Sequence, residues 1–164
     1  MGSASENSTL QSALLRLVVF SIDGQRYALP LSAAERVLPM VAVSPLPQAP
    51  AVALGVINLH GKVIPVLDFR RRLRLPPCDY GLAAHLLVAR TSRRMLAVPV
   101  DEVLEVREVA AEAITPPAAV LPGIGQVAGI VALPDGLLFI HDLDAFLSLH
   151  EERQLTEALE EMRG

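Results

Sequence analysis

The chain has 164 residues, of which 52% are apolar and only 4% aromatic, and its formal net charge is −4. That length suits one domain, or two small units that share a core, and the apolar content excludes a disordered chain. A nucleic-acid partner is disfavoured, because such proteins usually present a basic surface with stacking aromatic rings. Binding to another protein is the function that this composition opposes least.

Three features of the sequence concern its location. No apolar run is long enough to span a bilayer, and the polar segment Met1–Ser12 lacks the apolar stretch of a signal peptide. The single cysteine, Cys78, has no partner for an internal disulfide, which fits a reducing cytosol. We therefore expect a cytoplasmic protein without direct membrane insertion, and a mobile tail over residues 1–13.

The first half of the chain predicts five strands separated by turn signals. Asp23-Gly24 is a strong two-residue hairpin signal, and His60-Gly61 joins the last two strands. Ser32 and Glu35 have the spacing of a capping box, which indicates one helical turn before the third strand. The predicted strands are Leu15–Ile22, Gln25–Leu31, Arg36–Val43, Leu54–Leu59 and Lys62–Leu67.

The second half follows the same plan after a proline-rich boundary at residues 76–79. Asp68 and Asp142 each follow the last strand of their half, where a side-chain carboxylate can cap a short helix. Residues 150–164 predict a C-terminal helix with apolar residues on one face. The predicted strands of this half are Leu86–Thr91, Met95–Val100, Leu104–Val109, Val127–Leu133 and Leu137–His141.

An internal repeat links the two halves. Residues 55–68 align without a gap with residues 129–142, a shift of 74 positions that places Gly55 on Gly129. An earlier strand of the first half is also similar to a strand of the second half, at a shift of 69 positions. Two copies of one all-β unit, which differ mainly in the length of one loop, are the simplest account.

We therefore expect an all-β fold of two five-stranded, barrel-like subdomains packed together, with short helical turns and a C-terminal helix. Closure is expected because five strands cannot bury both faces of an open sheet. The units would span about residues 14–76 and 84–149, with interleaving of their strands possible. Strands that are apolar without alternation, such as residues 18–20 and 86–88, would then lie where the two units meet.

The block Gly55–Asp68 reads Gly-Val-Ile-Asn-Leu-His-Gly-Lys-Val-Ile-Pro-Val-Leu-Asp. It resembles the CheW family of chemotaxis coupling proteins, whose block usually reads Gly-Val-x-Asn-Leu-Arg-Gly-x-x-x-Pro-Val-x-Asp-Leu. The segment Tyr27–Pro30, the turn at Val98–Val103 and the closing strand pair extend the resemblance over residues 14–149. The resemblance implies two SH3-like β subdomains and a non-enzymatic adaptor role.

In this family, one surface engages the cytoplasmic tip of a chemoreceptor and another engages the regulatory domain of a CheA-type histidine kinase. The resemblance implies the same partners here, and a protein recruited to membrane-associated receptor arrays. Oligomeric state is left open. Carried over by position, or adjacent to positions so carried, the residues expected at partner surfaces are Glu35, Arg36, Val37, Leu54, Val56, Asn58, His60, Gly61 and Lys62.

Two of these positions depart from the family pattern. His60 replaces the usual Arg of the turn, and Arg36 stands where many members have Glu. A change of charge at an interface is a common way to separate parallel pathways. We therefore hypothesise an adaptor of an alternative chemosensory system. A competitor that occupies the kinase site without activating the kinase is the alternative.

One cluster indicates possible chemistry. His141, Asp142 and Asp144 could form a metal or acid–base site, and an enzyme using them is the competing function. The first copy of the repeat keeps the Asp but has Leu67 in place of the His, so a structural helix cap explains Asp142 better. We expect no cofactor, no metal and no catalytic residue.

Three further patterns have two interpretations each. The arginine run Arg70–Arg74 is either a solvated helix face or a patch for an acidic partner. Apolar residues around the proline-rich loop either plug the core or line a groove for a partner helix. The C-terminal stripe either packs on its own domain or contacts a second copy. The last two sets are Leu46, Val52 and Leu54, and Leu155, Leu159 and Met162.

Overall fold

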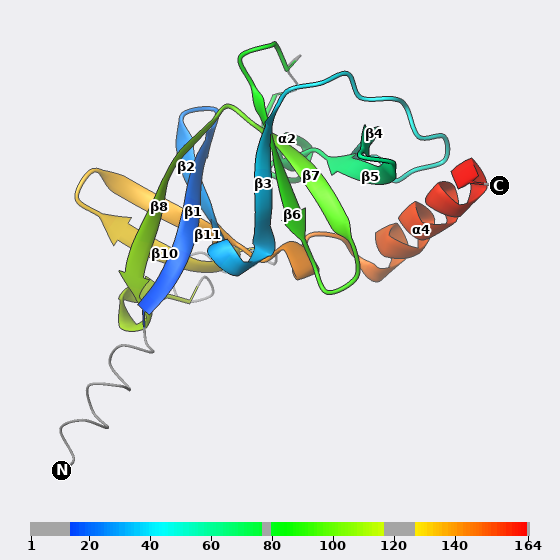
Figure 1. Cartoon of the computed structure of the whole chain (residues 1–164). Helices are drawn as coiled ribbons and strands as arrows, with labels where there is room; N and C mark the ends of the chain where they lie inside the picture. The colour runs from blue at the N-terminus through cyan, green and yellow to red at the C-terminus, as the bar shows by residue number, and fades with distance from the viewer. Residues whose placement is uncertain (1–13, 77–79, 117–126, 164) are drawn as a thin grey trace.

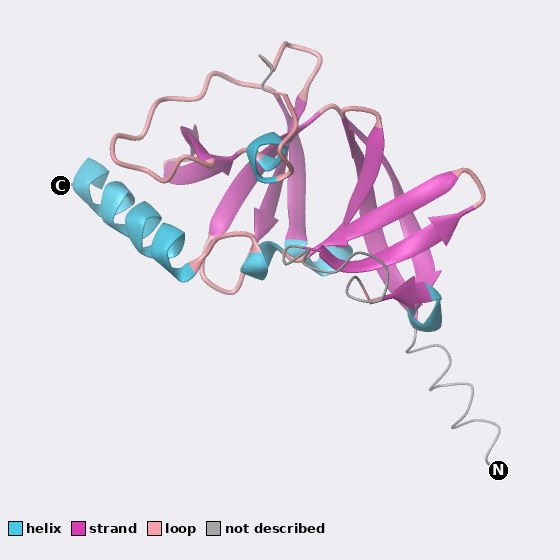
Figure 2. Cartoon of the chain, turned by 180° about the vertical axis from the view of Figure 1, so that it is seen from behind, coloured by secondary structure: helices cyan, strands magenta, loops and turns pink. Residues whose placement is uncertain are grey.

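The computed structural model describes residues 14–76, 80–116 and 127–163. The expected mobile tail, residues 1–13, lies outside these ranges, as does Cys78. Two β-sheets lie side by side, and the C-terminal helix α4 (Leu149–Arg163) lies on the side of the second sheet that is remote from the first (Figures 1 and 2). The fold is mostly β, as predicted.

The strands of the first half are β1 (Leu14–Ile22), β2 (Gln25–Pro30), β3 (Ala34–Pro39), β4 (Ala53–Leu59) and β5 (Lys62–Leu67). Those of the second half are β6 (His85–Arg90), β7 (Met95–Val100), β8 (Glu102–Ala110), β9 (Ile114–Thr115), β10 (Val127–Leu133) and β11 (Gly136–His141). Short helical segments are η1 (Leu31–Ala33), α2 (Phe69–Arg72), η2 (Ala111–Ala113) and η3 (Leu143–Ala145).

The two sheets exchange hairpins between the halves of the chain. Sheet A has the order β8-β1-β2-β11-β10-β9, and sheet B has the order β3-β6-β7-β5-β4. The β1–β2 hairpin of the first half therefore pairs with strands of the second half, and the β6–β7 hairpin does the reverse. The first five strands of sheet A correspond, in order, to the five strands of sheet B. The strands interleave, the option that the sequence left open.

Irregularities in the ladders recur at equivalent positions of the two sheets. The ladder of β3 skips Glu35 and that of β8 skips Leu104, 69 positions later. The ladder of β4 skips Leu54 and that of β10 skips Ala128, 74 positions later. These shifts match those of the sequence repeat. The bulges are therefore a property of the repeated unit, because bulges are retained where they re-aim a strand.

Gly55 and Gly129 allow a crossing segment to approach each sheet closely. Ser44 exchanges both backbone hydrogen bonds with Val56 of β4, at 2.8 and 2.9 Å, while β9 pairs with β10 at the equivalent place. A Cβ atom on Gly55 would overlap the Ser44 carbonyl oxygen, and one on Gly129 would overlap the Ile114 side chain. The repeated glycine is therefore required by contact with the crossing segment.

Three apolar clusters form the interior. One lies within sheet A (the sheet A cluster) and one lies within sheet B (the sheet B cluster). The largest, the central cluster, joins the two sheets with α2, η3 and α4. On β1, Leu17 and Val19 face the sheet A cluster while Phe20 and Ile22 face the central one. Both faces of β1, β2, β6 and β7 are thus covered, which explains their continuous apolar sequences. Leu46 and Val52 belong to the central cluster, so they are core residues.

The predicted helix caps are confirmed. The Asp68 carboxylate accepts a hydrogen bond from the Arg70 backbone N–H at 2.9 Å, and it also accepts one from the Tyr80 hydroxyl at 2.8 Å. The Asp142 carboxylate accepts one from the Asp144 backbone N–H at 3.1 Å. In both copies the aspartate satisfies a backbone donor that the start of a helix leaves without a partner.

Both interpretations of the arginine run are wrong for Arg70 and Arg72. Arg70 is only 5% exposed, and its guanidinium donates to the Pro76 carbonyl at 2.7 and 2.9 Å and lies 3.4 Å from Asp23. Arg72 donates to both carboxylate oxygens of Glu151 in α4 at 2.6 Å. These arginines therefore join elements within the chain, since charge-assisted hydrogen bonds are the stronger ones.

Candidate partner-binding surface

The β4–β5 turn is a tight two-residue turn. His60 and Gly61 both have positive φ values, 51° and 85°, as a type I′ turn requires. Asn58 Oδ1 accepts a hydrogen bond from the Gly61 backbone N–H at 2.9 Å. Asn58 and Gly61 therefore fix the turn, whereas His60 and Lys62 are exposed at its tip.

The predicted residues Glu35, Arg36 and Val37 lie on β3 and are exposed. Glu35 accepts a hydrogen bond from Arg90 Nε of the neighbouring strand β6 at 2.9 Å. The predicted capping box is wrong, because η1 has no side-chain cap and Ser32 makes no such bond. Glu35 is at a bulge and pairs across the sheet, so Arg36 is the charge of β3 that is left for a partner.

Two predicted residues of β4 do not lie on the surface. Val56 is 3% exposed and belongs to the central cluster, while Leu54 is partly buried against the sheet B cluster. The physical reason is the segment around Ser44, which pairs with Val56 and covers this edge of β4. We correct the prediction for Val56 accordingly: it supports the β4–β5 turn from within.

The exposed predicted residues gather at one end of sheet B. Because β3 runs antiparallel to β6 and β5 runs parallel to β7, the start of β3 and the β4–β5 turn both lie beside the β6–β7 turn. Three inter-strand spacings separate β3 from β5, which is about 14 Å along the sheet. The two predicted groups thus share an end of the sheet without touching.

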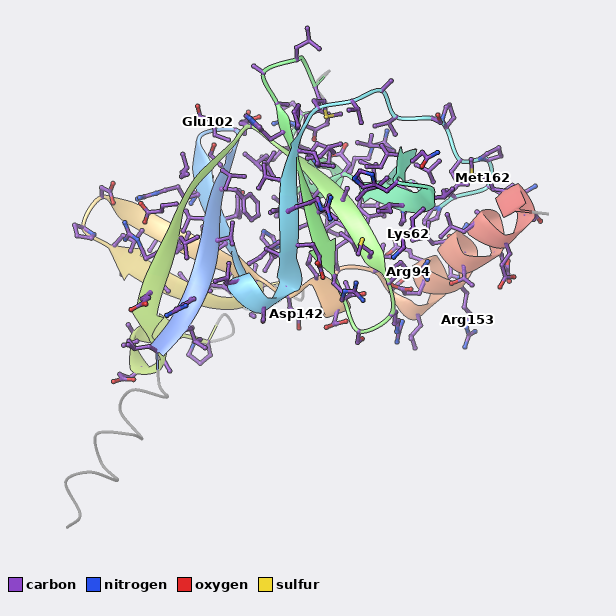
Figure 3. The ribbon with its side chains drawn as sticks, viewed as in Figure 1. Lys62, Arg94, Glu102, Asp142, Arg153 and Met162 are labelled. Atoms are coloured by element: carbon purple, nitrogen blue, oxygen red, sulfur yellow. The ribbon has the colours of Figure 1, made fainter. Side chains whose placement is uncertain are left out.

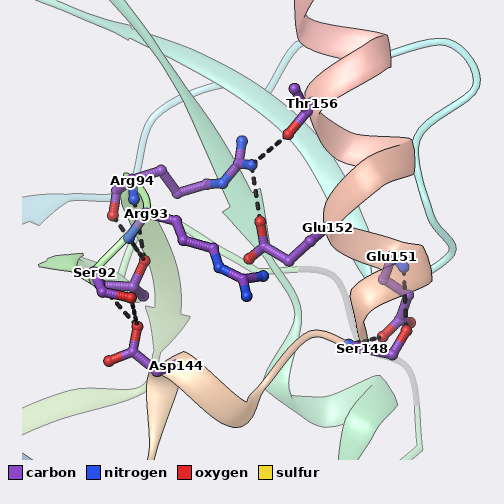
Figure 4. A network of polar contacts seen from close by, with 9 residues as sticks. Ser92, Arg93, Arg94, Asp144, Ser148, Glu151, Glu152 and Thr156 are labelled. Carbon is purple, nitrogen blue, oxygen red and sulfur yellow. Dashed lines mark hydrogen bonds and ion pairs between the residues drawn. The ribbon is translucent and has the colours of Figure 1, made fainter.

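The β6–β7 turn links this end to two other elements. The Ser92 backbone N–H and hydroxyl donate to the Asp144 carboxylate of η3, at 2.8 and 2.7 Å. Arg94 donates to Glu152 at 2.9 Å and to Thr156 at 2.7 Å, both in α4 (Figure 4). Nothing in the sequence indicates the role of this turn, because its partners lie 52 to 62 positions away and leave no local signal.

The residues of the possible catalytic cluster do not converge. His141 is 2% exposed, and its ring packs 4.6 Å from the centre of the Phe69 ring. Asp142 caps η3, and Asp144 points to the β6–β7 turn, where the hydrogen bonds from Ser92 hold the pKa of its carboxyl below the usual range. Among residues 14–76, 80–116 and 127–163, no group of three or more His, Cys, Asp or Glu side chains could hold a metal ion.

The fold and this surface define a class: a β scaffold that presents exposed turns and strand edges. The chain belongs to the CheW-like domain family, whose model matches residues 16–151. As a member of this family it is a chemotaxis coupling adaptor, as the sequence predicted. No helix in the described part of the chain is both long and apolar enough to cross a membrane.

The alignments with similar proteins extend over most of the chain. A probable chemotaxis protein CheW of Rhizobium etli is 28% identical over 134 residues, which is 80% of this chain and 86% of the relative. The chemotaxis protein CheW of Rhizobium meliloti is 27% identical over 140 residues, 84% of this chain and 90% of the relative. The solved structure of the scaffolding protein TtCheW from Thermoanaerobacter tengcongensis has a TM-score of 0.76 at 26% identity, covering 84% of this chain and 94% of that one.

Proposed function

We propose that this chain couples a chemoreceptor to a CheA-type histidine kinase by binding both at once, without catalysing a reaction itself. Family membership and the similarity to a protein described as a scaffold support the proposal. Coupling would follow from shared binding, because a bridged partner is held at a high effective concentration. We also propose a cytoplasmic location at receptor arrays, on the strength of the family alone.

One observation supports separate partner surfaces: exposed apolar residues occupy equivalent positions of β3 and β8. Val37 of β3 is 42% exposed, and Val106 of β8, 69 positions later, is 58% exposed. Leu104 is 44% exposed on the same strand. Figure 1 shows β3 and β8 on the same side of the molecule, one in each sheet. We assign the receptor tip to this face, because large apolar side chains exposed on the strands of one side of a protein are candidates for protein contacts.

We assign the kinase to the end of sheet B that carries the β4–β5 turn. His60 and Lys62 extend from a turn that is fixed by Asn58 and Gly61, so the turn is organised before it binds. Arg36 lies at the same end of sheet B, and it is the neighbour in sequence of Val37 on the proposed receptor face. Its positive charge, in place of the Glu of many relatives, is the feature that we expect to select the partner.

The test measures binding of the two purified partners from the source organism separately. Calorimetry with the kinase regulatory domain and with a receptor-tip fragment should show binding of both. A ternary mixture with the full-length kinase should raise its autophosphorylation. Binding of the kinase with lower autophosphorylation would support the competitor function instead, and binding of neither protein would end the proposal.

Two single substitutions separate the surfaces. Val37→Glu should weaken receptor binding by about tenfold and leave kinase binding within about twofold, because a buried unpaired charge is costly at a contact centre. Arg36→Glu should move the preference toward receptors of other chemosensory systems in the same organism. Unchanged preference after Arg36→Glu would contradict the role of that charge.

A further inference from the structure

Five cationic side chains have no carboxylate of the described residues within 4.0 Å, whereas eight other arginines are ion-paired. The five are Arg36, Lys62, Arg74, Arg93 and Arg153. Three of them, Lys62, Arg93 and Arg153, line a trough between α4 and the two adjacent turns of sheet B. Figure 3 shows Lys62 and Arg153 on this side of the molecule, far from Glu102.

The trough consists of two grooves that meet at the β6–β7 turn. One groove, of about 720 Å³, runs between the β4–β5 turn and the second half of α4. The other, of about 530 Å³, runs along the first half of α4. Arg93, Arg94 and Thr156 line both grooves. The trough therefore continues directly from the β4–β5 turn that we assign to the kinase.

The helical wall of the trough is firmly held. Leu155 of α4 is fully buried in the central cluster. Arg94 donates to Glu152 and Thr156, and both members of the Arg94–Glu152 pair are mostly buried. Arg72 holds Glu151 from α2. The wall is formed before any partner arrives, so its ordering costs nothing at binding.

The two walls of the trough differ in charge. Lys62 and Arg93 come from the turns of sheet B, and neither has an ion-pair partner in the described part of the chain, whereas Arg94 is neutralised by Glu152. The α4 wall carries Glu157 and Glu160, one helical turn apart, together with Arg153, so it is less positive than the turns. Apolar side chains complete the larger groove, namely Val63, Pro65, Met95 and Leu159. Complementary charge would come from carboxylates directed at the turns.

We propose that this trough binds an acidic, partly apolar segment of the kinase regulatory domain, and that α4 and the β6–β7 turn are thereby part of the kinase-binding surface. The inference rests on the proposed function, and it adds residues that the turn alone does not supply. Lys62 and Arg93 contact the carboxylates of the segment, while Met95 and Leu159 contact its apolar side chains.

The experiment measures the affinity of the purified kinase regulatory domain and of the receptor-tip fragment for full-length variants by calorimetry. The double variant Lys62→Glu/Arg93→Glu should bind the kinase domain about tenfold more weakly and the receptor fragment unchanged. Arg74→Glu, which reverses an unpaired arginine outside the trough, is the matched control and should bind both partners like the wild type.

A variant that is expected to strengthen kinase binding excludes misfolding as the explanation, because a misfolded protein would not bind more tightly. Glu160→Lys removes an acid from the trough, so it should bind the kinase domain about threefold more tightly. Wild-type kinase affinity in the double variant, or weaker binding by Glu160→Lys, would overturn the trough and leave the adaptor function standing. Failure of the wild-type chain to bind the kinase domain at all would overturn both.

Discussion

Gly55 is the residue whose conservation between the two copies has the clearest physical cause. Its φ of +152° lies outside the range that other residues adopt easily, and the Ser44 carbonyl occupies the space of a side chain. Gly129 lacks the unusual φ, and only the Ile114 side chain opposes a Cβ there. Gly24 has a φ of +80° and open space around it. A comparison of these three glycines therefore distinguishes the effect of steric overlap from the effect of backbone strain.

We expect Gly55→Ala to lower the free energy of unfolding by about 3 kcal/mol, because the alanine methyl group forces the crossing segment away from β4. Gly24→Ala should cost about 1 kcal/mol, the strain of a positive φ alone. Gly129→Ala should fall between them, since a side chain moves more easily than backbone. Urea unfolding followed by circular dichroism measures all three, and equal losses at positions 24 and 55 would refute this explanation.

Glu151 gives the second prediction at this scale. Burial opposes ionisation of its carboxyl, but hydrogen bonds from Arg72 and Ser148 outweigh burial and hold its pKa below the usual 4.5. A lowered pKa in the folded state stabilises the protein above pH 4.5, and that contribution is lost as the pH falls through the folded-state value. Glu151→Gln should therefore cost about 1 kcal/mol at pH 7 and progressively less toward pH 3.

The measurement is thermal unfolding of wild type and variant at a series of pH values. The matched control is Glu161→Gln, an exposed position on the same helix. It should unfold like the wild type throughout. A difference between Glu151→Gln and wild type that persists undiminished at pH 3 would show that the carboxylate charge is not the source of the stabilisation.

At the scale of elements, α4 is the part of the fold that joins the central core to the candidate surface. Leu155 and Ala158 are buried, Leu159 is partly buried, and Met162 is 46% exposed. The helix thus packs on its own domain through its first three turns. Met162, the C-terminal residue of the predicted stripe, lies at the exposed end of the helix, on the same side of the molecule as Lys62 (Figure 3).

Leu155→Ala should lower the free energy of unfolding by about 3 kcal/mol, because it leaves a cavity among well-packed neighbours. Leu149→Ala makes the same change at a position that is 65% exposed on the same helix, and it should alter stability by no more than about 0.5 kcal/mol. Chemical denaturation of both variants checks the pair. Similar losses would mean that the helix is not docked as described.

Local features of the fold could be predicted from the sequence, because the residues that form them are neighbours in the chain. Examples are the Asp23-Gly24 turn, with φ values of 56° and 80°, and the caps at Asp68 and Asp142. The exchange of hairpins could not be predicted, because the β1–β8 ladder joins residues such as Leu14 and Ala110. The sequence of a strand specifies which faces of the strand are apolar, but it does not specify which other strand pairs with it.

The candidate surface shows the same limit. Exposure of His60 and Lys62 follows from their place in a turn, whereas the burial of Val56 depends on Ser44, which lies outside the strand in sequence. Arg93 and Arg94 do not belong to any sequence motif that indicated a function. Their relevance arises only when the β6–β7 turn and α4 are brought together.

At the scale of the whole molecule, each half of the chain depends on the other for its hydrogen bonds. Besides each other, β1 and β2 pair only with β8 and β11 of the second half in the described structure, and β6 and β7 pair only with β3 and β5 of the first. A two-stranded hairpin without further strands is marginal in water. The exchange therefore makes one folding unit of two sequence copies.

This dependence predicts the behaviour of fragments 1–78 and 79–164. Each fragment alone should lack a cooperative thermal transition, because its hairpins lose the strands beside them and β3 or β8 is left without any partner. An equimolar mixture should regain the circular dichroism and the transition of the intact chain. Since the second fragment contains the whole of α4, Leu155→Ala in that fragment should weaken the association as well. A fragment that unfolds cooperatively by itself would contradict the exchanged arrangement, because it would mean that one copy can complete a sheet from its own strands.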